Sequence, residues 1–389
     1  MHDDPVAQHA RTILPFLAME VLERAVAMDA AGENVIHLEV GEPDFPTPPP
    51  VVEAALRALK DGRTKYTHSQ GTRELREAIC EHYAHRYGVA VTPERVMVTA
   101  GSSPAIWMVF TALLDPGDQV ILANPHYACY PNFVRICRGE PVFVGVREED
   151  GFRLDPAAAR AALGPRVKAI LVNSPANPTG AVLPGEALAR LAELGPMVVS
   201  DEIYHGLTYE GEEHSVLEYA PHSVVLNGFS KKYAMTGWRL GYAIVPPALV
   251  RPLQTMCQNF FVSPNDFVQA AGVAALREAG PDADRMRRVF AARRRLVLDG
   301  LRRLGFGIAV EPTGAFYVLA NARRYTADSL AFAFEILERA HVGVTPGIDF
   351  GRNAEGYLRF SYAASLERIE EGIARIGRFL GERGGEAKG

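Results

Sequence analysis

The sequence predicts an α/β protein: a large domain with a mostly parallel sheet covered by helices, followed by a smaller α+β domain. Short apolar runs recur between residues 95 and 245, with helical patterns between many of them. These runs are apolar on both faces, as the strands of a doubly covered parallel sheet must be. Beyond about residue 285 the pattern changes to long amphipathic helices with few strands. A chain of 389 residues is long enough for both domains.

The strands expected in the large sheet are short apolar segments that suit buried β-structure. Helical patterns such as "SPAIWMVFTALL" (103–114) and "GEALARLAEL" (185–194) supply the covering helices. We therefore expect the large domain over residues 45–285. Its predicted strands are "RVMVTA" (95–100), "QVILA" (119–123), "PVFVGV" (141–146), "VKAILVN" (167–173), "MVVS" (197–200), "SVVLNG" (223–228) and "LGYAIV" (240–245).

The smaller domain is expected over residues 286–389, and the N-terminal segment 1–44 is expected to join it. That segment contains an amphipathic helix pattern and the apolar run "VIHLEV". The final residues "GERGGEAKG" (381–389) are predicted to be disordered. The small domain's own patterns are a strand within 306–321, a helix at 329–340, a strand at 357–363 and a helix at 366–382.

Composition argues against several classes of partner. The net charge is −5 and no face is obviously basic, so nucleic acids and anionic membranes are poor candidates. The basic helix pattern at 284–305 is interpreted as a solvated face. The longest apolar runs have strand length, and the N-terminus has acidic residues but no long apolar core, so we expect neither a membrane span nor a signal peptide. The four cysteines form no CxxC pair, which suggests no metal site and fits a reducing cytoplasm.

The first candidate site is the turn in "VTAGSSPAIW". A buried strand ends at Ala100, the turn Gly101-Ser102-Ser103 follows, and Pro104 is expected near the start of a helix. Unpaired N–H groups at a helix N-terminus attract phosphate, and the two serines can add hydroxyl donors. An ordinary capped turn explains the same residues.

Two further turns follow predicted strands. Asp201 in "PMVVSDEIYHG" ends a strand at the sheet edge where open α/β proteins bind ligands. It is either a helix cap or a carboxylate that keeps a ring nitrogen protonated, and the Tyr204 hydroxyl can face the same ligand. In "LVNSPANPTG", Asn177 lies in a stiff turn whose X–Pro bonds can be cis or trans. Asn177 is either a turn residue or a donor to a phenolate oxygen.

The stretch "NGFSKKYAMTGWRLGYAIV" (227–245) places two lysines between apolar segments. Such a pair is either a solvated turn or contains a nucleophile, since lysine becomes nucleophilic when it is desolvated or set beside other cations. Arg239 can supply that positive potential and bind a phosphate. An amine at Lys231, a carboxylate at Asp201, a hydroxyl at Tyr204 and a phosphate turn together describe one ligand, pyridoxal phosphate.

The chain resembles the class I/II aminotransferases among the fold-type-I pyridoxal-phosphate enzymes, from "VIHLEV" to "YLRFSYA". The resemblance implies an enzyme that moves an amino group from an L-amino acid to a 2-oxo acid, acting as a homodimer with shared active sites. The motifs that carry it are "GEPDFPTP" (41–48), "KYTHSQGTRELREAI" (65–79), "NSPANPTG" (173–180), "SDEIY" (200–204), "SKKYAMTGWRLGY" (230–242) and "PTGAFYV" (312–318).

The resemblance also implies roles for individual residues. Lys231 is similar to the Schiff-base lysine that removes the α-proton, and "MTGWR" downstream favours it over Lys232. The implied cofactor contacts are the phosphate ligands Ser102, Ser103, Ser230 and Arg239, the stacking residue Tyr127, the ring-oxygen ligands Asn177 and Tyr204, the ring-nitrogen ligand Asp201, and Tyr66, which reaches the phosphate of the neighbouring subunit.

Substrate contacts are implied in the same way. Arg359 in "YLRFSYA" resembles the arginine that clamps the α-carboxylate through its planar fork. The backbone of Gly41 and the side chain of Asn177 lie against the same group in the family. Phe16 either lines an apolar side-chain pocket or packs within an amphipathic helix. Ser103 stands where some aspartate-specific relatives have a lysine, so neutral aliphatic or aromatic donors are favoured.

Two other functions are compatible with these residues. A carbon–sulfur β-lyase, or a related elimination enzyme, uses the same constellation, because reaction choice depends on small differences in the placement of the base. A pyridoxal-phosphate-binding sensor module is the second, although such regulators carry an N-terminal winged helix that we do not find here.

Overall fold

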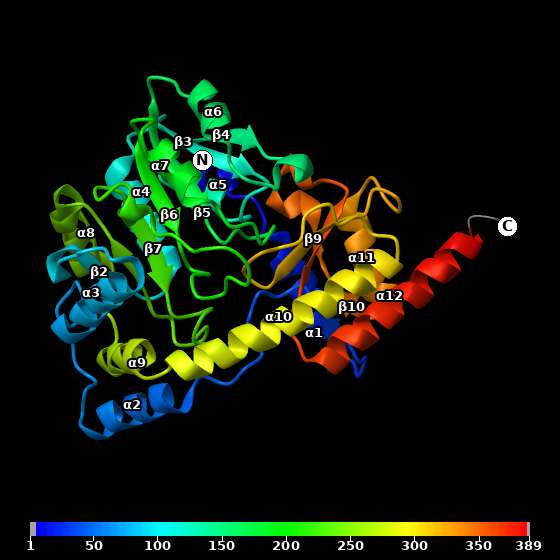
Figure 1. The fold of residues 1–389 in the computed structure, drawn as a ribbon, viewed down its shortest axis with the longest axis horizontal. Helices are drawn as coiled ribbons and strands as arrows, with labels where there is room; N and C mark the ends of the chain where they lie inside the picture. Colours follow the sequence, from blue (N-terminus) through cyan, green and yellow to red (C-terminus); the bar gives the residue numbers. More distant parts are fainter. Residues whose placement is uncertain (1–4, 387–389) are drawn as a thin grey trace.

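The structure is a computed structural model that describes residues 5–386. Residues 1–4 and 387–389, which belong to the expected N-terminal segment and tail, lie outside this range. Within it, seven strands form the large sheet in the order β2-β8-β7-β6-β5-β3-β4 (Figure 1). All run parallel except β8, which is antiparallel to both neighbours. The strands are β2 (Val96–Thr99), β3 (Gln119–Asn124), β4 (Glu140–Gly145), β5 (Val167–Asn173), β6 (Met197–Asp201), β7 (Val224–Gly228) and β8 (Gly241–Ile244).

The predicted fold class is confirmed, because successive residues of the central strands enter two separate apolar cores. In β7, Val224 and Leu226 pack on one side of the sheet and Val225 packs on the other. One core is covered by α4 (Ser102–Leu113), α5 (Tyr130–Ile136) and α8 (Pro247–Phe260). The other is covered by α2 (Pro49–Lys60), α3 (Arg73–Tyr87), α6 (Pro156–Ala161), α7 (Gly185–Ala192), α9 (Asp266–Arg277) and part of α10 (Gly280–Arg303).

The smaller domain has an antiparallel sheet in the order β11-β12-β9. Figure 1 shows α10 running beside α12 and reaching from the large domain to this sheet, so the expected boundary at residue 285 falls inside one continuous helix. The N-terminal helix α1 packs against α11, and β1 pairs with β10. The remaining α-helices and β-strands are α1 (Leu17–Ala30), β1 (Ile36–His37), β9 (Tyr317–Asn321), α11 (Ser329–Ala340), β10 (Val342–Gly343), β11 (Thr345–Pro346), β12 (Tyr357–Ser361) and α12 (Leu366–Glu386).

The prediction of a disordered tail is wrong for residues 381–386, because α12 continues to Glu386. Arg383 explains the extension. Its side chain forms an ion pair with Glu335 of α11 at 3.2 Å and donates to the backbone oxygen of Tyr325 at 2.8 Å. These contacts anchor the last turns of a helix whose sequence is polar and glycine-rich.

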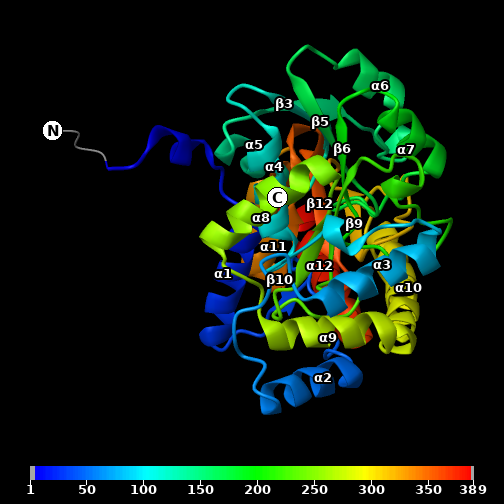
Figure 2. The same cartoon turned by 90° about the vertical axis from the view of Figure 1, so that its left-hand side faces the viewer.

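The chain before α1 projects from the body of the molecule (Figure 2). Two hydrogen bonds between the backbone of Leu14 and the side chain of Asn132 tie its base to α5, at 3.1 and 2.9 Å. Among the described residues, no helix combines the length and apolar character needed to cross a membrane.

Candidate active site

A cavity of about 380 Å³ opens at the carboxyl ends of β5, β6 and β7 and reaches the small-domain sheet. This is the edge at which open α/β sheets bind ligands. Every residue predicted for the site except Tyr66 lines this cavity. They are Phe16, Gly41, Ser102, Ser103, Tyr127, Asn177, Asp201, Tyr204, Ser230, Lys231, Arg239 and Arg359.

One corner of the cavity has the features of an anion-binding site. Helix α4 begins at Ser102, two residues before the predicted start, so the backbone N–H groups of both serines belong to its unpaired first turn. Its N-cap, Gly101, has φ 93° and offers no side-chain cap. A Cβ on Gly101 would lie 2.6 Å from Nη2 of Arg239, so only glycine lets the guanidinium approach the helix end. Helix dipole and guanidinium together suit a phosphate.

Lys231, rather than Lys232, enters the cavity. Its Nζ donates to the backbone oxygen of Gly41 at 2.7 Å. Burial lowers the lysine pKa to about 8, and the cations Arg359 and Arg239 act in the same direction. Lys232 lines a different cavity, on the far side of the turn, and its ammonium lies 5.1 Å from the centre of the Tyr233 ring.

Asp201 is buried at the end of β6. Its Oδ2 accepts a hydrogen bond from the Tyr130 hydroxyl at 2.7 Å, and its Oδ1 accepts one from the backbone N–H of Ile203 at 3.1 Å. Burial raises the carboxyl pKa to about 6 despite these donors. A cationic ring nitrogen placed beside Asp201 would restore the charged form.

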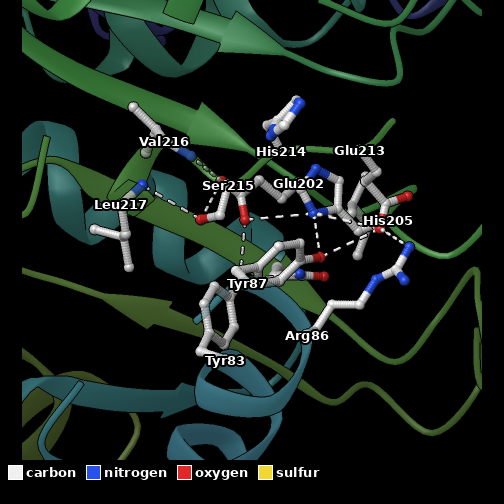
Figure 3. A network of polar contacts seen from close by, with 12 residues as sticks. Tyr83, Arg86, Tyr87, Glu202, His205, Glu213, His214, Ser215, Val216 and Leu217 are labelled. Carbon is white, nitrogen blue, oxygen red and sulfur yellow. Dashed lines mark hydrogen bonds and ion pairs between the residues drawn. The ribbon is translucent and has the colours of Figure 1, made fainter. Parts of the chain in front are cut away.

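The residue after Asp201 belongs to a separate network of buried polar contacts (Figure 3). Glu202 is fully buried, and its carboxylate accepts hydrogen bonds from Ser215 Oγ at 3.0 Å and the Tyr83 hydroxyl at 3.1 Å. His205 Nδ1 lies 3.5 Å from the same carboxylate and 2.7 Å from the Tyr87 hydroxyl. This buried network fixes the segment that carries Asp201 and the cavity-lining tyrosine three residues later.

Asn177 and Tyr204 face the cavity beside groups from the small domain. Asn177 Oδ1 accepts a hydrogen bond from Arg359 Nη1 at 3.0 Å, which orients the amide so that its NH₂ remains to donate. The Tyr204 hydroxyl lies 2.9 Å from that of Tyr317. The peptide bond between Asn177 and Pro178 is cis, as is the bond between Ser174 and Pro175.

Arg359 is 2% exposed, and its guanidinium is held on several sides. Nη2 donates to Thr345 Oγ1 at 3.0 Å and to the backbone oxygen of Glu39. The guanidinium carbon lies 4.4 Å from the centre of the Tyr317 ring and 5.0 Å from that of Phe350. Its buried Nε has no partner within the described residues. A buried cation with an unused donor, at the cavity wall, suits a substrate carboxylate.

One apolar wall of the cavity comes from α1, through Ala18, Met19 and Leu22. Phe16 precedes this helix, and its ring meets the Tyr127 ring edge-on, with centroids 5.9 Å apart. Tyr66, in contrast, is 84% exposed and lies outside the cavity.

These groups fit pyridoxal phosphate one by one: the anion-binding corner suits its phosphate, a buried carboxylate suits its protonated ring nitrogen, an amide donor suits its ring oxygen and a desolvated amine suits its aldehyde. Within residues 5–386, no three histidine, cysteine, aspartate or glutamate side chains gather as metal ligands would.

Comparisons with known proteins show the family of the chain. Residues 33–376 match the family described as aminotransferase class I and II. The chain belongs to this family. This class I/II aminotransferase is an enzyme that depends on pyridoxal phosphate, as its family does.

Several relatives of this aminotransferase match over nearly its whole length. It is 42% identical to an aspartate/prephenate aminotransferase of Thermus thermophilus, over 97% of this chain and 99% of the relative. It is 38% identical to a valine–pyruvate aminotransferase of Mycobacterium tuberculosis, over 94% and 96%. A solved structure of the Thermus thermophilus aspartate aminotransferase with maleate covers 97% of this chain and 100% of its own, with TM-score 0.93 and 41% identity. The lyase and sensor alternatives are not favoured.

Several residues that support the site were not predicted from the sequence. Tyr130 lies only three residues after Tyr127, and this short separation could have paired it with the same ligand. Tyr317 lies inside the motif "PTGAFYV" but was not predicted to take part in the site. Thr345 had no usable signal, because it meets Arg359 only through the register of β11 and β12.

Proposed function

We propose that this aminotransferase takes its amino group from a neutral L-amino acid, aliphatic or aromatic, and passes it to a 2-oxo acid. The observation that supports this donor class is the distribution of charge in the cavity. Among the described residues of one subunit, the cations that line it are Lys231, Arg239 and Arg359, and the proposed roles of these three leave none for a second substrate carboxylate. Ser103 is uncharged, and the wall contributed by α1 is apolar.

Glu42 strengthens the argument against a dicarboxylate donor. This carboxylate lines the same cavity and accepts a hydrogen bond from Thr236. A distal carboxylate of aspartate would therefore meet a like charge without gaining a cation of its own, and desolvating an unpaired charge is costly. Because one relative is named an aspartate/prephenate aminotransferase, aspartate is the rival donor to test.

The proposed mechanism assigns proton transfer to Lys231 and binding to its neighbours. A pKa near 8 leaves a larger fraction of Lys231 as free amine at neutral pH than an exposed lysine has, so Nζ can accept the substrate's α-proton. Arg359 holds the α-carboxylate with its fork. Bound pyridoxal phosphate supplies a ring that accepts the negative charge developing at the α-carbon.

The remaining cavity residues would hold the cofactor in place. Asp201 would keep the ring nitrogen protonated, with the Tyr130 hydroxyl fixing its orientation. Asn177 and Tyr204 would bond the ring oxygen, and Tyr127 would stack on the ring. The phosphate would lie at the α4 terminus, against Ser102, Ser103, Ser230 and Arg239.

A half-reaction screen tests the donor class. The purified holoenzyme is mixed with valine, leucine, phenylalanine, aspartate or glutamate, and loss of the visible absorbance of lysine-bound cofactor is followed. We expect the best neutral donor to react at least about tenfold faster than aspartate, as one unpaired charge is worth a kcal/mol or more. Aspartate ranking first would reject this donor class.

We also propose a homodimer in which Tyr66 of each subunit reaches the phosphate of the other, and a cytoplasmic location. The high exposure of the Tyr66 ring, 84%, supports the first proposal. All four cysteines are free, which supports a reducing compartment. The division at residues 44 and 285 is likewise a proposal, with α10 as the connection between the two domains.

A further inference from the structure

The first turn of α1 is capped by a carboxylate that lies far away in the sequence. Phe16, at the N-cap position, gives this helix no side-chain cap. Asp349 supplies both acceptors instead: its Oδ1 accepts from the backbone N–H of Leu17 at 2.9 Å and its Oδ2 from that of Ala18 at 3.1 Å. A carboxylate at a helix N-terminus satisfies unpaired donors and complements the helix dipole.

This same turn forms the apolar wall of the cavity. Phe16, Ala18 and Met19 all line it, directly beside the two N–H groups that Asp349 holds. The Phe16 ring also rests edge-on against Tyr127. The two hydrogen bonds therefore set where the wall stands relative to the cofactor end of the cavity.

The segment that carries Asp349 also supports the carboxylate clamp. Thr345 accepts a hydrogen bond from Arg359 Nη2 at 3.0 Å, and the Phe350 ring lies 5.0 Å from the same guanidinium. The segment is anchored in turn, because the backbone N–H of Ile348 donates to Ser329 Oγ at 3.1 Å. Residues 345–350 thus connect the group that would hold the substrate's α-carboxylate to the wall that would meet its side chain.

The rest of α1 does not need Asp349 for its position. Val21, Ala25 and Met28 pack with Leu337 of α11 in a separate apolar cluster. Losing the cap should therefore loosen the first turn without detaching the helix.

We propose that Asp349 is a positioning residue for donor selection: it fixes the first turn of α1 so that Phe16 and Met19 hold the side-chain end of the cavity in place. This inference rests on the proposed function, in that it takes the α1 wall to face the donor side chain.

The test compares Asp349→Ala with wild type on donors of different length. For leucine and phenylalanine we expect kcat/KM to fall about tenfold or more, mainly through KM, because two charge-assisted hydrogen bonds are lost. For alanine, whose methyl group is short, the loss should stay below about twofold. Hydrogen exchange in the unliganded holoenzyme should rise at the amides of Leu17 and Ala18. For Asp349→Asn, which keeps one acceptor, kcat/KM for leucine and phenylalanine should lie between the values of wild type and Asp349→Ala.

Asp328→Ala is the matched control. Asp328 caps α11 of the same domain by accepting from the N–H of Ala331 at 2.9 Å, and it does not line the cavity. In this variant, the ratio of kcat/KM for leucine to kcat/KM for alanine should equal the wild-type ratio.

Equal losses of kcat/KM for alanine and leucine in Asp349→Ala would overturn the proposal. Unchanged kcat/KM for both donors, together with faster hydrogen exchange at the amides of Leu17 and Ala18, would also overturn it. The donor screen with the wild-type enzyme has a separate outcome. If aspartate proves the best donor, the donor class is wrong, whereas the ratio of long to short donors in Asp349→Ala still tests the wall.

Discussion

At the scale of single residues, burial shifts the two central charges of the cavity toward their neutral forms. The Lys231 pKa falls to about 8 and that of Asp201 rises to about 6, and desolvation is the largest cause of both shifts. A cofactor with a cationic ring nitrogen offsets the free-energy cost of ionising the buried Asp201 carboxyl. The reaction, in contrast, needs Lys231 as a free amine. The empty and loaded cavities should therefore respond differently to mutation and to pH.

Lys231→Ala should abolish the visible absorbance of lysine-bound cofactor and reduce turnover by at least about a thousandfold, because general base and point of attachment are both lost. Lys232→Ala is the matched control, since that side chain lines another cavity. Spectra and single-turnover rates of both variants measure the effect. Unchanged absorbance in Lys231→Ala would reject this lysine.

The apoprotein should lose stability as pH rises from about 4 to 6. The folded-state pKa of Asp201 is raised, so its contribution is fully present below the unfolded value of 3.8 and is lost as pH rises through about 6. A shift of this size corresponds to about 3 kcal/mol. Urea unfolding of apoprotein at pH 4 and 7 measures the loss, and Asp201→Asn should remove the part that Asp201 contributes. Asp349, also raised to about 6 by burial, adds a loss of the same sign.

At the scale of elements, short pieces of the small domain hold the substrate end of the cavity. Strand β1 has two residues, yet the segment after it carries Glu39, whose backbone oxygen accepts from Arg359. His37 stabilises this segment, because its ring nitrogens lie 2.6 Å from the Glu39 carboxylate and 2.8 Å from that of Asp29. An ion-paired histidine thus contributes to the geometry around the arginine.

Stability of the holoenzyme should fall as pH rises through about 9. Hydrogen bonding to Glu39 is the main cause that raises the His37 pKa to about 9, so this contribution is fully present below 6.5 and is lost through 9. Partial exposure reduces the expected loss to about 2 kcal/mol. Urea unfolding at pH 6 and 9.5 measures it, with His37→Gln as the comparison. An equal loss in that variant would assign the pH dependence to other groups.

At the scale of the whole molecule, residues near the ends of strands could be predicted and those fixed by tertiary register could not. Asp201 and Lys231 follow apolar strands of the sheet, so their convergence follows from parallel topology. The reversal of β8 leaves no signal in its apolar sequence, because both orientations bury the same side chains. Thr345 and Asp349 act on the cavity through other residues and do not line it. Asp349 contacts α1 across more than three hundred residues of sequence, and Thr345 meets Arg359 through strand register, so neither contact leaves a local signal in the sequence.

The proposed dimer can be tested through Tyr66. Tyr66 lies outside the cavity of its own chain, so a role at the phosphate requires a second subunit. Tyr66→Phe should weaken cofactor binding about tenfold, as expected for one hydrogen bond to a charged group, while sedimentation shows a dimer. Mixing Tyr66→Phe with Lys231→Ala subunits then decides where the hydroxyl acts. In a hybrid, the site with an intact lysine faces the intact tyrosine of its partner, so tight cofactor binding should return in that site. If mixing restores nothing although hybrids form, the tyrosine does not act across the interface.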